Sequence, residues 1–376
     1  MDCLRHPTSA IPDLLGAYLK LGPLTQAGKP KPAMMSPEAI LNKKEKTAVT
    51  LLRKRRTYRD NQLLQNALRE TLALIGYTDP VKGRGIRVLS IDGGGTRCRS
   101  SIHAGSGPLF SRGVCRDVSS FGSEVFRQNP LVGTVKMGWS HSYYNTETWE
   151  TILQEKLGHR VLIKTAREEI SPKVSAVSAV VNWGMSPKAF VFRNYNHKPG
   201  SLSRYRRLRL PDVAGCASII SSPGDGGIIL NNPCALAVHE SRLLWPNQPF
   251  QCVLSLGTGR YDNVKRAPTT STSLRAKISN LISSATDTEG VHTLLDDLLA
   301  PDVYFRFNPM LSALVSLDES RPQALDQLHR DTQNYLERNR PKLARLCLVL
   351  GAERSAVSRT KDWMSERAWE MKQRWV

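Results

Sequence analysis

The chain has 376 residues, enough to bury a large core in one large or two ordinary domains. Lys and Arg total 53 against 33 Asp and Glu, and the formal net charge of +20 favours an anionic partner such as a phospholipid surface. The sequence contains neither a Cys/His finger nor an aromatic RNA-binding motif, so we expect no nucleic acid partner.

The cysteines and histidines predict neither a disulfide framework nor a metal site. The seven cysteines are scattered and never spaced as Cys-x-x-Cys, which is typical of a reduced, intracellular protein. No His-Glu-x-x-His helix or EF-hand loop is present, and we therefore expect no metal and no other cofactor. Because the sequence has no apolar run long enough to span a bilayer and no signal-peptide core, we expect any membrane contact to be peripheral.

The first part of the chain is predicted to lead into the folded domain. Residues 1–40 contain six prolines, too many for a packed element, and are predicted to be a flexible lead. Residues 41–80 form a basic helical lead, with leucines at helical spacing from Leu64 to Leu72. Its run of arginine and lysine at residues 53–56 is typical of a solvated helix face, of a segment that docks on anionic lipid, or of a nuclear signal.

Residues 85–97 are the most informative stretch, an apolar run that ends in an acid and three glycines. The branched side chains of residues 86–91 predict a buried β-strand. After Asp92, three glycines allow a tight turn whose N–H groups are not covered by a side chain. Such groups bind a phosphate, as in a sugar-kinase-like phosphotransferase that uses ATP, or the oxyanion that develops during acyl transfer. A plain structural turn is the third interpretation.

The chain after this loop alternates between strands and helices. Three segments have the pattern of strands: residues 173–181, 189–192 and 250–256. A helix is predicted over residues 235–244, and the chain from about residue 271 is largely helical. The alternation predicts an α/β fold with a mainly parallel sheet, in a domain over residues 81–310, with C-terminal helices at 311–376 packed on it.

Several motifs, taken together, identify a family. They are residues 75–80 running into the glycine loop, residues 132–137, residues 187–195, Asp225-Gly226-Gly227 with Asn231-Asn232-Pro233, residues 255–260 and residues 304–309. In these segments the chain resembles the patatin-like phospholipases, and within them the calcium-independent phospholipases A2 of the gamma type. The resemblance covers roughly residues 71–97 and 122 to the C-terminus. It implies a patatin-like three-layer fold around a mainly parallel central sheet, and it favours the oxyanion interpretation of the loop over the phosphotransferase.

The resemblance also implies a serine–aspartate dyad. The family's aspartate stands in an Asp-Gly-Gly or Asp-Gly-Ala turn, which Asp225, Gly226 and Gly227 match. A carboxylate within hydrogen-bond reach of a serine hydroxyl can accept its proton while the serine attacks a fatty-acyl ester. The glycines that match the family's oxyanion loop are Gly93, Gly94 and Gly95.

The chain departs from the family at the nucleophile. The family serine stands in Gly-x-Ser-x-Gly on a sharp strand-to-helix turn, and this sequence has no such pentapeptide. Ser106 lies in the right interval, but its glycines are adjacent, so a loop serine is the alternative to a substitute nucleophile. The stretch from Cys98 to Ser120 replaces the expected strand, elbow and helix, which predicts that part of the core around the elbow is lacking. An arginine-rich segment, residues 201–222, replaces the family's run of small residues.

The resemblance therefore implies a calcium-independent lipid acyl hydrolase of the phospholipase A2 type, acting on glycerophospholipids at a membrane surface. Its base would be Asp225, and its nucleophile is not identified beyond Ser106. The alternative is a catalytically inactive patatin-like isoform that binds lipid or membrane, which the missing elbow and the excess of basic residues favour. By resemblance we expect an intracellular, peripheral location on mitochondrial, peroxisomal or endoplasmic reticulum membranes.

Overall fold

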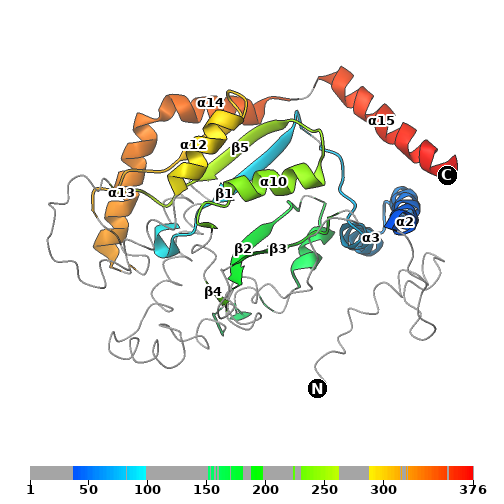
Figure 1. Cartoon of the computed structure of the whole chain (residues 1–376), viewed down its shortest axis with the longest axis horizontal. Coiled ribbons are helices and arrows are strands. Elements are labelled where there is room, and N and C mark those ends of the chain that lie inside the picture. The colour runs from blue at the N-terminus through cyan, green and yellow to red at the C-terminus, as the bar shows by residue number, and fades with distance from the viewer. Residues whose placement is uncertain are drawn as a thin grey trace.

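The computed structural model describes residues 37–81, 83–98, 151–152, 154–155, 158, 161–169, 171–180, 188–197, 223–224, 230–261, 288–313, 315, 319, 321–353 and 355–375. Among them, helices surround two small sheets, and α2 is the first and α15 the last of the described elements (Figure 1). No helix in these residues is long and apolar enough to cross a membrane. The prolines of residues 1–36 and the segment 99–150 lie outside the described residues.

The basic lead contains two packed helices, α2 (Pro37–Thr57) and α3 (Gln62–Leu74). Their apolar faces form one cluster with fully buried leucines, among them Leu51 and Leu68, as the helical spacing predicts. The side chain of Asn61 accepts a hydrogen bond from the Leu64 N–H at 3.0 Å and caps α3. At the other end Gly76, with φ of 83°, reverses the chain. The boundaries proposed for the lead and the domain stay predictions.

The central sheet consists of three parallel strands in the order β1-β5-β6. They are β1 (Ile86–Ile91), β5 (Phe250–Leu256) and β6 (Tyr304–Phe307). In the register of β1 and β5, Leu89 lies opposite Leu254 and Ile91 opposite Leu256. Strands β1 and β5 lie where the apolar runs of the sequence predicted strands. Strand β6 lies within the family motif at residues 304–309.

Helices cover both faces of this sheet. On one face α10 (Cys234–Leu244) and α12 (Thr288–Leu298) pack against Val253. On the other face α13 (Pro322–Arg338) and α14 (Arg340–Gly351) pack against the alternate side chains of β5 and the phenylalanines of β6. Because parallel sheets are stable when both faces are covered, this α–β–α layering is the arrangement expected of the predicted α/β fold (Figure 1).

The second sheet is antiparallel, which the expectation of one mainly parallel sheet did not include. It has the order β3-β2-β4, with strands β2 (Ser175–Val180), β3 (Lys188–Arg193) and β4 (Pro223–Gly224). The first two match the predicted strands, and they pair along their whole length, whereas β4 pairs only with the end of β2. A 3₁₀ helix, η3 (Leu162–Arg167), precedes this sheet and contacts α3.

One expectation for β1 was wrong in part. Its apolar side chains were expected to be buried, but Leu89 is 60% exposed and Ile91 is 44% exposed. The helices α13 and α14 cover β5 and β6 on this face, and among the described residues none of them extends over β1. The last helix, α15 (Ala356–Trp375), lies beside α2 and not on the sheet (Figure 1).

Candidate functional site

The glycine loop lies at the carboxyl end of β1, between two other loops. The N–H of Asp92 still donates to the carbonyl of Leu256 on β5, at 2.9 Å. The next N–H, of Gly93, donates to the carbonyl of Asn231 at 3.2 Å, in the turn that precedes α10. Ligand sites of parallel α/β sheets lie at the carboxyl ends of their strands, so the position of the loop agrees with a binding or catalytic role.

Close packing explains why the loop consists of glycines. A Cβ on Gly94 would come within 2.6 Å of both Cβ and Oγ1 of Thr258, in the Gly-Thr-Gly loop after β5. A Cβ on Gly93 would stand 2.9 Å from the side-chain oxygen of Asn231. Gly95 has a φ of 54°, in the left-handed region that favours glycine. The loop therefore sits against its neighbours with no room for side chains.

A buried ion pair fixes the residue before the loop. Arg306 on β6 donates to both carboxylate oxygens of Asp92, at 3.0 and 2.7 Å, and to the hydroxyl of Ser255 on β5, at 2.8 Å. Burial alone would lower the pKa of the Arg306 guanidinium, but the hydrogen bonds and charge of Asp92 raise it above its ordinary value. Arg306 thus stays charged and links β6, β5 and the start of the loop.

The same arginine is held by a second layer of contacts. Glu289, on α12, lies 3.4 Å from an Arg306 nitrogen and accepts a 2.8 Å hydrogen bond from the side chain of Asn308. Asn308 in turn accepts from the N–H of Gly259 at 2.9 Å. The loops after β1, β5 and β6 are therefore joined into one network by polar side chains.

The predicted oxyanion donors differ in their availability. The N–H of Gly93 is engaged with Asn231, so the amides of Gly94 and Gly95 are the better candidates to bind an anion. Cys98, the first residue of the stretch expected to replace the elbow, directs its sulfur to the carbonyl of Asp92 at 3.7 Å. Burial raises the pKa of the Cys98 thiol. The role of the three glycines as oxyanion donors stays a prediction.

The two predicted dyad residues lie outside the described residues. Ser106 falls in the segment 99–150, and Asp225, Gly226 and Gly227 follow directly after β4. The last described residue before them, Gly224, pairs with Ala179 of β2. The convergence of the glycine loop with Asp225 thus stays a prediction.

A second buried cluster was not predicted from the sequence. Glu240 on α10 accepts two hydrogen bonds from Arg193 at the end of β3, one from the Tyr195 hydroxyl at 2.9 Å and one from His197 at 2.9 Å. Burial alone would raise the pKa of Glu240, but the hydrogen bonds from Arg193, His197 and Tyr195 lower it to about 2. The cluster fastens the antiparallel sheet to the helix that packs on the central sheet.

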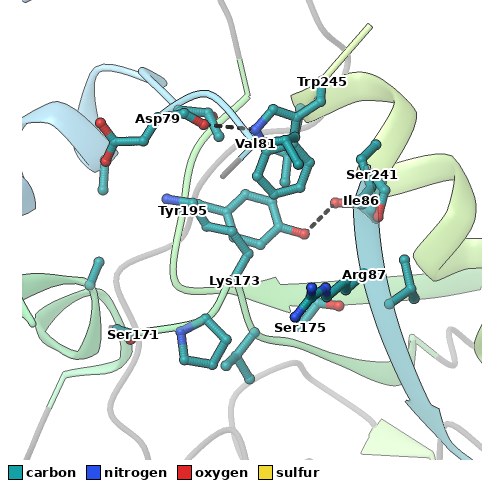
Figure 2. Close-up of a pocket in the computed structure, with 18 of the residues that line it drawn as sticks. Asp79, Val81, Ile86, Arg87, Ser171, Lys173, Ser175, Tyr195, Ser241 and Trp245 are labelled. Atoms are coloured by element: carbon teal, nitrogen blue, oxygen red, sulfur yellow. Dashed lines mark hydrogen bonds between the residues drawn. The ribbon is translucent and has the colours of Figure 1, made fainter. Parts of the chain in front are cut away.

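A large cleft separates the two sheets. It has a volume of about 1760 Å³ and is lined by β1, the start of β2, α3 and one side of α10. Figure 2 shows Lys173 near the Tyr195 ring, Arg87 beside Ser175, and Trp245 next to Asp79. The Trp245 ring N–H donates to the carbonyl of Asp79 at 2.9 Å. This hydrogen bond joins the segment after α10 to the segment before β1, and both residues line the cleft. The cleft reaches Gly93, the first residue of the glycine loop.

The chain is similar to proteins whose names state an activity. It is 44% identical over 374 positions to calcium-independent phospholipase A2-gamma of Oryctolagus cuniculus and 45% identical to that of Rattus norvegicus, with 85% of this chain aligned in both cases. The chain spans about half the length of these relatives, 46% and 47% respectively. It is also 25% identical over 258 positions to phospholipase A I of Arabidopsis thaliana, which covers 55% of this chain and 19% of the relative. No protein-family model matches the chain.

The extent of these alignments shows a gap in this chain. The alignment has 374 positions, but it contains only 85% of the 376 residues of this chain, which is about 320 residues. About 54 positions of the relative therefore have no counterpart here. The resemblance seen in the motifs agrees with these comparisons, and over 85% of its length the chain is a homologue of proteins named calcium-independent phospholipase A2-gamma.

Proposed function

We propose that the chain is a lipid acyl hydrolase of the calcium-independent phospholipase A2 type, which cleaves fatty-acyl esters of glycerophospholipids. The observation that carries the proposal is the glycine loop, which is held at the carboxyl end of β1 by the Asp92–Arg306 pair in a homologue of phospholipases. The N–H groups of Gly94 and Gly95 would stabilise the oxyanion of the tetrahedral intermediate, and Asp225 would accept the proton of the attacking hydroxyl.

The same geometry argues against the phosphotransferase. A phosphate loop of that kind needs the acid before the glycines to be free for Mg²⁺ or for the nucleotide. Here both oxygens of Asp92 accept from Arg306, and the side chains of both residues are buried. The acid therefore has a structural role in positioning the loop.

The alternative is a catalytically inactive homologue that binds lipid. Two observations favour it, the absence of a Gly-x-Ser-x-Gly pentapeptide from the sequence and the roughly 54 positions of the relative that have no counterpart here. In that case the net charge of +20 would still attract the chain to anionic phospholipid from the aqueous side. We propose a peripheral, intracellular membrane location for either form.

Fatty-acid release distinguishes the two functions. The full chain is incubated with phosphatidylcholine vesicles in the presence of a calcium chelator, with the rabbit relative as positive control. Release by this chain that falls at least ~10²-fold in Asp225→Asn would support hydrolysis with Asp225 as base. Ser106→Ala tests the nucleophile in the same assay. Absence of release, with co-sedimentation on anionic vesicles that is lost at high salt, would replace the hydrolase by the inactive lipid-binding homologue.

A further inference from the structure

The last helix, α15, presents a row of apolar side chains to the solvent. Val357, Met364 and Met371 follow one another at a spacing of seven residues, which is close to two turns of an α-helix. The three residues therefore lie along one side of α15, over ~21 Å at 1.5 Å per residue. Their exposed fractions are 79%, 54% and 55%. Apolar side chains grouped on one exposed side of a helix are typical of an interaction surface.

The packing of α15 against the rest of the chain leaves this row uncovered. Among the described elements, the main neighbour of α15 is α2, and Figure 1 shows α15 apart from the central sheet. Trp363 and Arg367 of α15 line the large cleft together with the last turn of α2. The guanidinium group of Arg367 lies 5.6 Å from the centre of the Trp363 ring. The apolar row is on a different side of the helix and is not covered by this contact.

Cations border the apolar row on both of its sides. At about 100° per residue, Lys361 and Arg367 lie about 60° to the two sides of the row, and both are exposed. The long stems of such residues lie along an apolar surface while their charged groups reach outward. The acids of the helix recur at positions 362, 366 and 370, which the same geometry places opposite the row. Positive charge is therefore next to the apolar side chains.

This pattern does not match a helical partner. A coiled-coil seam needs apolar residues at both the a and the d positions of each heptad. With the row at a, the d positions hold Thr360 and Arg367, and with the row at d, the next a position holds Lys361. Both assignments place a polar residue in the seam. A single apolar row bordered by cations is instead typical of a helix that lies in the plane of a membrane interface.

We infer that α15 is a membrane-docking helix that lies on an anionic phospholipid bilayer. Its apolar row enters the boundary between head groups and acyl chains, and Lys361 and Arg367 contact lipid phosphates. The net charge of +20 attracts the whole chain to such a surface, and the row determines which part of it inserts. The inference rests on the proposed peripheral membrane location for the nature of the partner, and it does not require that the chain hydrolyses lipid.

The test is co-sedimentation of the full chain with sucrose-loaded vesicles of phosphatidylcholine and phosphatidylserine in equal amounts. We expect Met364→Asp with Met371→Asp to weaken binding at least ~tenfold, because two inserted apolar side chains are lost. The matched control is Leu294→Asp with Leu298→Asp on α12, since these leucines are 61% and 74% exposed and the change of charge is the same. Equal binding of the two double variants would overturn the inference.

Two further variants test the cations and the width of the row. Lys361→Gln should weaken binding to the anionic vesicles about fivefold and leave binding to pure phosphatidylcholine unchanged. An equal loss in Arg338→Gln, on α13, would mean that net charge alone holds the chain, and would reject the role of α15. Thr360→Leu widens the row and should strengthen binding at least ~threefold, a gain that damage to the fold cannot produce. Melting curves show that each variant is folded.

Sedimentation velocity without lipid tests whether a second copy of the chain covers the row. A dimer that Met364→Asp with Met371→Asp dissociates, with vesicle binding unchanged, would overturn the inference in favour of self-association. Hydrolysis of monomeric dihexanoyl phosphatidylcholine separates docking from the proposed function, because this substrate needs no membrane. We expect equal rates in the parent chain and in this double variant. Absence of hydrolysis in both would count against the proposed hydrolase alone, since vesicle binding is measured without it.

Discussion

The guanidinium group of Arg306 on β6 forms a two-point ion pair with Asp92, the residue between β1 and the glycine loop, and both side chains are only 2% exposed. Strands β1 and β6 are not neighbours in the sheet, so the arginine crosses β5 to reach the aspartate. On the way it donates to Ser255 of β5. One side chain therefore fixes the relative positions of all three strands at the edge where the candidate site lies.

Removal of the arginine leaves a buried carboxylate without its partner. We expect Arg306→Ala to lower the free energy of unfolding by ~3–5 kcal/mol, measured by urea denaturation. The exposed pair of Arg345 and Asp302 is the control, because its side chains are 62% and 46% exposed, and Arg345→Ala should cost less than ~1 kcal/mol. The double variant Asp92→Leu with Arg306→Met removes both charges and should recover most of the loss. A double variant as unstable as the single one would show that packing, and not the unpaired charge, is the cause.

The Glu240 cluster predicts a loss of stability in acid. The pKa of Glu240 is lowered to about 2 in the folded chain, against an ordinary value of 4.5. A carboxyl whose pKa is depressed on folding contributes stability above the unfolded pKa, and this contribution is lost as the pH falls from about 4.5 towards about 2. Because one pKa unit corresponds to ~1.4 kcal/mol, the lowered pKa of Glu240 corresponds to roughly 3 kcal/mol of folding stability.

The measurement is the free energy of unfolding of the parent chain and of Glu240→Gln between pH 7 and pH 2. The variant should be less stable than the parent at pH 7, because Arg193 keeps its charge and loses its partner. The difference between the two should shrink as the pH falls through the window. A difference that is constant with pH would mean that Glu240 is not ionised in the folded chain.

The sequence predicted the elements of this fold better than their contacts. The glycines and apolar runs located β1, β5 and α10 to within a residue or two, because local patterns determine them. For Arg306, the sequence analysis identified only that it lies in a family motif, at residues 304–309, and it predicted no role for this side chain. Its place in the alternation Tyr-Phe-Arg-Phe, with aromatic residues on both sides, was the one signal that it points into the protein.

The Glu240 cluster and the open face of β1 could not be predicted in this way. Glu240 lies 43 residues beyond His197 in the chain, and no local pattern indicates that they meet. The exposure of Leu89 depends on where α14 ends over the sheet, which is a tertiary property of residues far along the chain. Both features arise from packing between segments that the sequence does not place together.

Thiol reactivity should follow the burial of the described cysteines. Cys347 on α14 is exposed, Cys98 is half-buried, and Cys234 and Cys252 are buried. Burial raises the pKa of both buried thiols to about 11, so little reactive thiolate forms there at pH 8. We expect iodoacetamide to modify Cys347 first, Cys98 more slowly, and Cys234 and Cys252 only on unfolding, as followed by peptide mass spectrometry. Early modification of Cys252 would contradict the packing of β5 against α14.

The last prediction concerns the close contact of the glycine loop with Thr258. A Cβ on Gly94 would stand 2.6 Å from the Thr258 Cβ, so Gly94→Ala must displace one of the two loops. We expect a loss of ~1–3 kcal/mol in the free energy of unfolding, as for other overpacked sites. Gly351 at the end of α14 is the control, because a Cβ there meets nothing within 4 Å, and Gly351→Ala should be neutral or stabilising by up to ~1 kcal/mol.

The second variant needed is Gly94→Ala combined with Thr258→Gly, which vacates the space that the new methyl group enters. If steric overlap with Thr258 is the cause, this variant should be more stable than the sum of the two single changes predicts, since residues in contact couple by ~0.5–3 kcal/mol. Strict additivity would mean that the loops do not touch. The comparison thus tests, without any assay of activity, whether the loops after β1 and β5 meet at the proposed site.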